Sequence, residues 1–213
     1  MKVVAINGSP HADGNTAAAL GIMAEELAAE GIETEILQVG GQMIRGCVDC
    51  GHCSSSEANA CVFKDDVVNE FTAKMRSADG IILGAPTYFA GIPGETKAFL
   101  DRAFYSSRRS ERFKHKVGTA LTVARRAGGN DALHQLMDFL DLSETVTPPA
   151  QYWTVVYGRE KKEVLKDEEG IQTLRKNARA MAWLIKMIDA TKGKIPTPGE
   201  GRTEKKLRTN FIR

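Results

Sequence analysis

The stretch KVVAINGSPHADGNT, residues 2–16, decides the fold of this 213-residue chain. Its first seven residues form an apolar, valine- and isoleucine-containing run that ends in glycine, which is typical of a strand buried on both faces of a parallel sheet. A loop of glycine and short polar residues follows. A helical pattern then covers 15–31 and ends at Gly31. The stretch therefore predicts a strand, then a loop rich in turn-forming residues, then a helix that crosses over to the next strand.

The same alternation continues along the chain. Further strands are predicted at 32–39, 80–86, 116–124 and 151–158, and further helices at 64–80, 93–104, 130–142 and 171–188. Strands that alternate with helices predict parallel pairing and helices on both faces of the sheet. We therefore expect an α/β doubly wound, three-layer sandwich whose five-stranded parallel sheet has the flavodoxin-like order 2-1-3-4-5.

Composition limits the function classes. The chain is 42% hydrophobic and 26% charged, which is ordinary for a globular protein, and its net charge of +2 is too small to indicate a nucleic-acid partner. No apolar run approaches the roughly 20 residues needed to cross a bilayer. The N-terminus lacks the long apolar segment of a signal peptide. We expect a cytoplasmic protein with no membrane or nucleic-acid partner.

The charge is concentrated at one end of the chain. Residues 192–213 carry seven Lys or Arg against two Glu, with proline and glycine that disfavour a second core. We expect one domain over 1–190 and a basic arm over 191–213. The late apolar residues Phe211 and Ile212 predict that the arm contacts another subunit of a homodimer or homotetramer, with a chance packing contact as the alternative.

In a doubly wound sheet, ligands bind beyond the carboxyl ends of the strands, where the winding reverses. The first loop there, GSPHADGNT, joins a buried strand to a helix N-terminus, which favours an anion. Ser9, Asn15 and Thr16 add short polar side chains, and Gly14 lets the backbone curl. The loop has neither a Walker lysine nor G-x-G-x-x-G. It predicts a phosphate monoester such as that of FMN, with a plain capped turn as the alternative.

Two more loops reach the same edge. APTYFAGIPG, 85–94, offers aromatic faces and backbone groups to a flat ring, unless its aromatic residues simply pack under the loop. ARRAGGND, 124–131, offers a glycine wall at Gly128 and Gly129. Its Arg125 and Arg126 could bind a phosphate. We expect instead that both side chains are exposed to solvent.

All four cysteines lie within 46–61: Cys47, Cys50, Cys53 and Cys61, at spacing C-x2-C-x2-C-x7-C. Two-residue gaps let three thiolates point inward from one loop, and a fourth closes a cubane cluster. We rank a [4Fe–4S] cluster first, then reduced thiols with a lost or vacant cluster, then zinc, then a disulfide. His52 could join a zinc set, although a solvated loop position is expected.

The motifs GSPHADGNT, CVDCGHC…C…KDD, PTYFAGIPGETKAFLDR and RRAGGND resemble the NADPH-dependent FMN reductase family of flavodoxin-like proteins, and the cysteine spacing resembles its iron–sulfur flavoprotein branch. The resemblance covers about 1–190 and implies bound FMN, often in a dimer or tetramer. The implied FMN contacts are Ser9, Pro10, His11, Gly14, Asn15 and Thr16 at the phosphate, Pro86, Thr87, Tyr88, Phe89 and Gly91 along the isoalloxazine, and Gly128 and Gly129 opposite. His11 stands where relatives usually have arginine, so the second phosphate contact that this arginine would make is not implied for this chain.

Three functions remain open at this stage. The first is an enzyme in which NAD(P)H reduces FMN, which passes electrons to the cluster or to an acceptor; this chemistry requires no catalytic side chain. The second is an electron carrier or redox sensor served by a ferredoxin-like donor. The third is a zinc-stabilised binding protein without flavin. The sequence leaves the acceptor and the choice of NADH or NADPH undetermined.

Overall fold

The computed structural model of the chain describes residues 1–55, 59–108, 110–200, 207 and 209. At its centre lies a five-stranded sheet in the order β2-β1-β3-β4-β5, and all four strand pairs are parallel. The strands are β1 Lys2–Asn7, β2 Glu33–Gln38, β3 Gly80–Pro86, β4 Val117–Ala124 and β5 Val155–Tyr157. The predicted fold class and strand order are confirmed.

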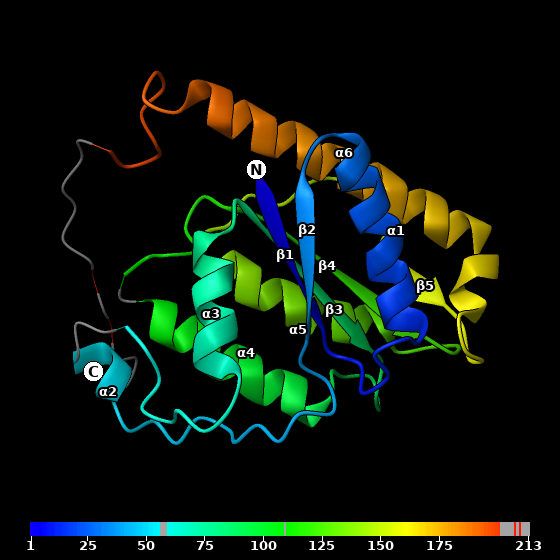
Figure 1. Ribbon diagram of the computed structural model, residues 1–213, viewed down its shortest axis with the longest axis horizontal. Coiled ribbons are helices and arrows are strands. Elements are labelled where there is room, and N and C mark those ends of the chain that lie inside the picture. Colours follow the sequence, from blue (N-terminus) through cyan, green and yellow to red (C-terminus); the bar gives the residue numbers. More distant parts are fainter. Residues whose placement is uncertain (56–58, 109, 201–206, 208, 210–213) are drawn as a thin grey trace.

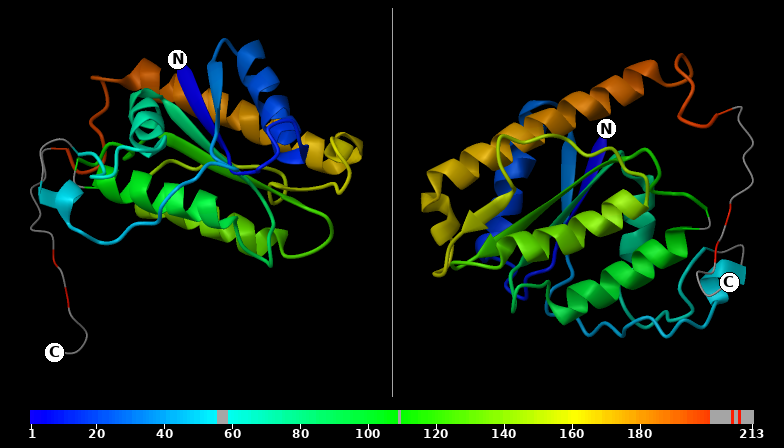
Figure 2. Two further views of the ribbon diagram at one scale, coloured as in Figure 1. Left: turned by 60° about the horizontal axis from the view of Figure 1, so that its bottom comes forward. Right: turned by 180° about the vertical axis from the view of Figure 1, so that it is seen from behind.

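Helices cover both faces of the sheet, as Figures 1 and 2 show. α1 and α6 lie on one face, and α3, α4 and α5 lie on the other. The helices are α1 Asn15–Ala29, α2 His52–Ser55, α3 Val68–Ser77, α4 Gly94–Arg108, α5 Gly129–Leu142, the 3-10 helix η1 Glu163–Lys166 and α6 Glu168–Thr191.

Two apolar clusters fill the spaces between the layers. β1 contributes to both, because alternate strand residues face opposite sides: Val3 and Ala5 pack with α1 and α6, whereas Val4 and Ile6 pack with α3 and α4. β3 is buried along nearly its whole length, which explains its uninterrupted apolar sequence. Strands buried on both faces are rigid supports for the loops that follow them.

Several predicted elements differ in their bounds from the observed ones. The fifth strand was expected over 151–158, but β5 covers only Val155–Tyr157. Before it, the Gln151 side chain donates to the Thr173 hydroxyl of α6 at 3.3 Å, and Trp153 is half exposed. The helix expected over 64–80 begins at Val68. The Asp66 carboxylate accepts from the Val68 N–H at 3.1 Å, so the chain before Val68 stays outside the helix.

The final helix is longer than the predicted 171–188 and continues to Thr191, where a turn closes with the Lys194 N–H donating to the Thr191 carbonyl at 2.9 Å. Phe211 and Ile212, on which the predicted subunit contact depends, lie outside the described residues. No helix within the described ranges has both the length and the apolar character needed to cross a membrane.

Candidate functional site

The loops after β1, β3 and β4 meet at one edge of the sheet and are bonded to one another. The Gly8 N–H donates to the Gly84 carbonyl at 2.7 Å, and the Thr87 N–H donates to the Val123 carbonyl at 2.8 Å. The Thr96 hydroxyl of α4 donates to the Gly8 carbonyl at 3.0 Å. The structure therefore brings together the three segments that the sequence predicted as one ligand site.

In the first loop, Ser9 is fixed by its neighbours. Its N–H donates to Asn7 Oδ1 at 3.1 Å, and its carbonyl accepts from Gln38 Nε2 at 2.6 Å. Its Oγ accepts from the His11 N–H at 3.2 Å and retains its own proton as a donor. Gln38 was not predicted, although it ends the neighbouring strand at this edge.

The N-terminus of α1 has an arrangement that suits an anion. Its N-cap residue, Gly14, makes no side-chain cap, and no acidic residue occupies its first turn. The first N–H groups of α1 have no partner within the helix and point out of its end. Thr16 is almost fully buried there, whereas Pro10 and His11 are exposed on the outer side of the loop.

Asn15 has a further role that the sequence did not indicate. Its side-chain amide donates to the Glu160 carbonyl at 2.9 Å, and its Oδ1 accepts from the Val164 N–H at 3.1 Å. These bonds tie the start of α1 to the chain around η1. Direct contact of Asn15 with a phosphate stays a prediction, while its bracing of the loop is visible.

The second loop ends in a tight hairpin turn. Tyr88 and Gly91 exchange backbone hydrogen bonds of 2.8 and 2.9 Å, and the two residues between them, Phe89 and Ala90, have φ angles of +49° and +59°. Left-handed backbone at two non-glycine residues is costly and concentrates at functional sites. The turn leaves the Phe89 ring fully exposed at the tip and Tyr88 half exposed beside it.

The second and third loops together form a cradle. Gly128 has φ +81°, and a Cβ there would lie 3.0 Å from the Cα of Ala90. Beside this contact, the Thr87 hydroxyl oxygen is buried and has no hydrogen-bond partner within the described residues. A buried hydroxyl without a partner, beside a glycine that lets a ligand come close to the backbone, suits a flat ring with polar edge atoms.

The remaining predicted positions have structural places within the loops and elements at this edge. Pro86 ends β3 and Gly91 closes the hairpin. Gly129 is buried as the first residue of α5, where a Cβ would lie 2.4 Å from Val155 Cγ1. Arg125 and Arg126 are exposed, as expected of solvated arginines.

The cysteines gather elsewhere, near the C-terminal half of α4. Cys47, Cys50, Cys53 and Cys61 line one small cavity together with Phe63, Arg102 and Tyr105. All four, each in the described part of the chain, are free thiols. Burial raises the pKa of the Cys53 thiol, and the neighbouring cysteines add to the shift.

The four thiols line the same cavity but do not converge on one point as metal ligands would. Among the described residues no three histidine, cysteine or carboxylate side chains converge closely enough to hold a metal ion. The backbone turns tightly between the first cysteines, with left-handed φ at Asp49 and Gly51. Four thiols on a turning loop are the type of ligand that iron–sulfur clusters use.

Side chains that the sequence left without a role hold the cysteine segment in place. Asn69 of α3 accepts from the Cys61 N–H at 2.8 Å and donates to the Cys61 carbonyl at 3.0 Å. Arg76 of α3 donates to the carbonyl of Asn59, and Arg102 of α4 donates to Cys61 Sγ at 3.2 Å. The role of Arg102 could have been suspected from the sequence, because a charged residue at this position interrupts the apolar stripe of its helix.

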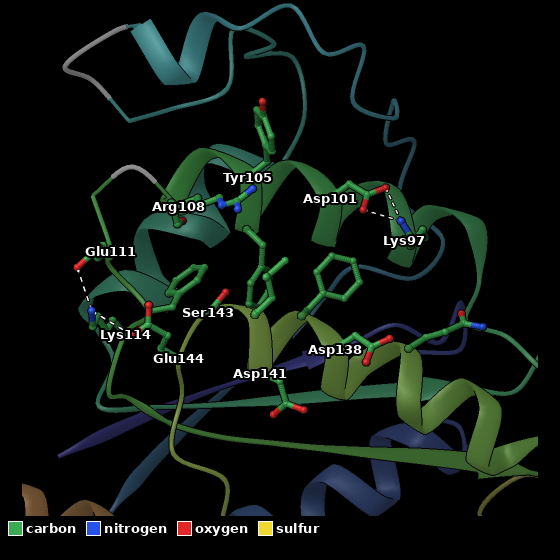
Figure 3. Close-up of a pocket in the computed structure, with 16 residues that line it drawn as sticks. Lys97, Asp101, Tyr105, Arg108, Glu111, Lys114, Asp138, Asp141, Ser143 and Glu144 are labelled. Carbon is green, nitrogen blue, oxygen red and sulfur yellow. Dashed lines mark hydrogen bonds and ion pairs between the residues drawn. The ribbon is translucent and has the colours of Figure 1, made fainter. Parts of the chain in front are cut away.

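The cavity that Figure 3 shows is a separate groove between α4 and α5, of about 730 Å³. Phe104, Phe113 and Phe139 line it together with charged residues that include Lys97 and Asp138. Tyr105 projects from α4 away from α5, toward the cysteine segment, and lines both cavities. Sequence patterns gave no indication of this groove, which lies beside the predicted ligand loops and not among them.

The doubly wound sheet with this loop edge defines a flavodoxin-like fold. The solved structure of RosB with a bound flavin intermediate is similar, with a TM-score of 0.70 at 15% identity, covering 100% of this chain and 92% of that one. A flavodoxin, WrbA-like protein from Agrobacterium tumefaciens has a TM-score of 0.62 at 15% identity, covering 87% of this chain and 98% of that one. At such low identity these likenesses concern the fold alone.

Sequence comparison identifies the family. The chain belongs to the NADPH-dependent FMN reductase family, whose model matches residues 1–160. An iron–sulfur flavoprotein of Methanocaldococcus jannaschii is 33% identical over 195 residues, covering 88% of this chain and 99% of that protein. An iron–sulfur flavoprotein of Methanosarcina thermophila is 28% identical over 198 residues, covering 91% and 100%. The chain is thus an FMN flavoprotein oxidoreductase by family.

Proposed function

We propose that this chain moves electrons from NAD(P)H to an acceptor through FMN, and that Cys47, Cys50, Cys53 and Cys61 hold a [4Fe–4S] cluster that shares in this transfer. The observation that carries the proposal is the pairing of two sites on one domain. One is the loop edge with its unpaired Thr87 hydroxyl, and the other is the cavity lined by every cysteine of the chain.

FMN supplies hydride acceptance and one-electron transfer when bound, so the protein has only to bind, orient and shield it. The N-terminus of α1 and the hydroxyls of Ser9 and Thr16 would hold the phosphate. The Thr87 hydroxyl would donate to or accept from the ring edge, which would satisfy an otherwise unpaired group. The Tyr88–Gly91 hairpin and Gly128 would bound the ring on its two sides.

A cluster supplies one-electron transfer, and four thiolates are the donor set that such a cluster requires. Zinc prefers the same sulfur ligands, so the metal has to be identified by analysis. Two of the cysteines, Cys47 and Cys50, are exposed, which would place one side of the metal site near the surface.

That exposure supports a second candidate function. A metal site at the surface is accessible to a protein redox partner, so a ferredoxin-like donor could deliver electrons directly to the cluster and FMN would relay them. The names of the relatives, iron–sulfur flavoproteins, agree with either role.

We propose a homodimer or homotetramer as the working assembly.

Anaerobic reduction of the purified flavoprotein distinguishes the two functions. Rapid bleaching of the flavin absorbance by NADH or NADPH, followed by reoxidation by a quinone, is the result expected of the reductase. Bleaching by a chemically reduced ferredoxin alone would contradict direct NAD(P)H use and favour the carrier. A comparison of NADH with NADPH in the same experiment assigns the nucleotide.

A further inference from the structure

Arg102 is a buried arginine with a complete set of hydrogen bonds. Its side chain has no exposed surface, and a guanidinium has five N–H donors. Nε donates to Cys61 Sγ at 3.2 Å. One terminal nitrogen donates to the Arg45 carbonyl at 3.0 Å and to Asp66, and the other donates to Asp66 at 3.1 Å and to the Phe63 carbonyl at 3.3 Å. All five donors are therefore used.

The partners of Arg102 share one property: they all belong to the segment 45–66, which carries the cysteines. Arg102 itself lies on α4, a helix anchored in the core through Phe99 and Ala103. The planar fork of a guanidinium fixes its partners in direction as well as distance. A rigid element of the fold thus determines the path of the cysteine segment.

Charge balance explains why the arginine is tolerated in this place. The Asp66 carboxylate pairs with two guanidinium nitrogens and has only 8% of its side chain exposed. This pairing, together with the other hydrogen bonds of Arg102, offsets the cost that either charge would have if it were buried alone. The Nε–H is directed away from Asp66, to sulfur, and is the part of the guanidinium that can act on a metal ligand.

Cys61 is held more firmly than the first two cysteines. Asn69 fixes both its N–H and its carbonyl, and Arg102 fixes its sulfur, whereas Cys47 and Cys50 are exposed. A pre-positioned ligand reduces the ordering that metal binding must impose on the loop. Hydrogen bonds to the sulfur ligands are also among the factors that set the reduction potential of an iron–sulfur cluster.

We propose that Arg102 is a positioning residue for the metal ligand Cys61, and that its Nε–H bond to Cys61 Sγ raises the reduction potential of the cluster. The inference rests on the proposed cluster. The physical reason is that reduction adds negative charge to the cluster and its thiolates, and a hydrogen-bond donor aimed at sulfur stabilises the more negative state.

Two variants separate the sulfur contact from the burial of charge. Arg102→Gln combined with Asp66→Asn removes both charges together, so no unpaired buried charge remains, and the asparagine oxygen can still accept from the Val68 N–H. Arg102→Lys keeps a cation beside Asp66 but has no Nε–H fork to direct at sulfur. Arg108→Gln, at an exposed position on the same helix, is the matched control.

The measurement is a dithionite titration of anaerobically purified holoprotein, with the reduced cluster followed by electron paramagnetic resonance and iron, sulfide and folding checked on each sample. We expect both Arg102 variants to shift the one-electron reduction equilibrium about tenfold toward the oxidised cluster, which is about 59 mV lower in potential. Arg108→Gln should match the wild type. A solely structural role would reduce thermal stability but leave both the iron content and the cluster potential of the folded protein unchanged.

The outcomes are distinct. Loss of the cluster from variants that remain folded, with Arg108→Gln unaffected, would support the positioning role of Arg102. An unchanged potential in both Arg102 variants, with the cluster present, would overturn the inference and leave the proposed function intact. A wild-type protein without iron and sulfide after anaerobic preparation would overturn the cluster and the inference together.

Discussion

At the residue scale, Gly128 shows how one side chain can decide access to a ligand site. Its positive φ of 81° suits glycine, and its Cα faces the turn at Ala90 with no room for a further carbon. The contact joins the loop after β4 to the hairpin after β3. Any displacement there moves both walls of the cradle.

We therefore expect Gly128→Ala to weaken FMN binding and to lower the free energy of unfolding by about 1 kcal/mol, the cost of left-handed backbone in a residue with a Cβ. Fluorescence titration of FMN into flavin-free protein measures the first effect, and urea unfolding measures the second. Gly21→Ala is the control, because a Cβ at Gly21 meets nothing within 4 Å. Equal FMN affinity in the two variants would disprove the proposed position of the ring.

The cysteine segment gives a second prediction at this scale. Replacement of a ligand should release the metal, so Cys50→Ser should reduce iron far below the wild-type content in anaerobic preparations. His52→Ala should retain it, because sulfur suffices for an iron–sulfur cluster. Metal analysis that shows iron lost from both variants would make His52 a ligand, and zinc in place of iron would favour the structural metal site.

At the scale of elements, α4 links the two sites. Its Thr96 bonds to Gly8 at the flavin edge, and its Arg102 and Tyr105 line the cysteine cavity. The six and nine residues between these positions correspond to about 9 and 14 Å along a helix. A rigid helix of this kind would keep the two sites in a fixed relation within one chain.

At the start of α6, one side chain connects this helix to the end of β5. Asp167 caps this helix by accepting from the Gly170 N–H at 2.9 Å, and its other oxygen accepts from the Tyr157 N–H at 2.8 Å at the end of β5. Asp167→Ala should lower the free energy of unfolding by about 1 kcal/mol, the usual value of such a cap. Asp189→Ala, exposed near the other end of α6, should cost little. Chemical denaturation that finds equal losses would argue against the cap.

Local patterns predicted most of the elements but not how side chains meet across them. Parallel pairing followed from the alternation of strands and helices, since β1, β3 and β4 are buried runs. The strand order followed from the flavodoxin-like arrangement that five such strands suit. The loop edge followed from the same order. By contrast, Arg102 and Cys61 are 41 residues apart, and their contact depends on how α4 lies against the cysteine segment. Such pairs require the tertiary structure, although both residues fall in motifs that the family resemblance covers.

At the scale of the whole molecule, the chain carries an α/β domain followed by a basic segment. The described part of that segment, up to Glu200, forms one side of a cavity with α6 and the start of β4. Ile195 is 63% exposed there, so it offers apolar surface to a neighbour. This exposed apolar surface is the observation that motivates the proposed role of the arm in assembly.

Deletion of 192–213 should therefore lower the oligomeric state, because it removes both the described turn and the last apolar residues. Light scattering coupled to size-exclusion chromatography measures the mass, and circular dichroism confirms that the domain still folds. Deletion of 201–213 alone tests whether the described turn suffices. An unchanged mass after the longer deletion would show that the arm is not needed for assembly.

The composition of the anaerobically purified protein tests both proposed sites at once, by its absorbance spectrum and by quantitative analysis of FMN, iron and acid-labile sulfide. We predict one FMN per chain and about four iron and four sulfide per chain, with the cluster visible as a broad shoulder beside the flavin bands. Flavin without iron would confirm the loop edge and contradict the role given to the cysteines. A colourless protein would contradict both sites.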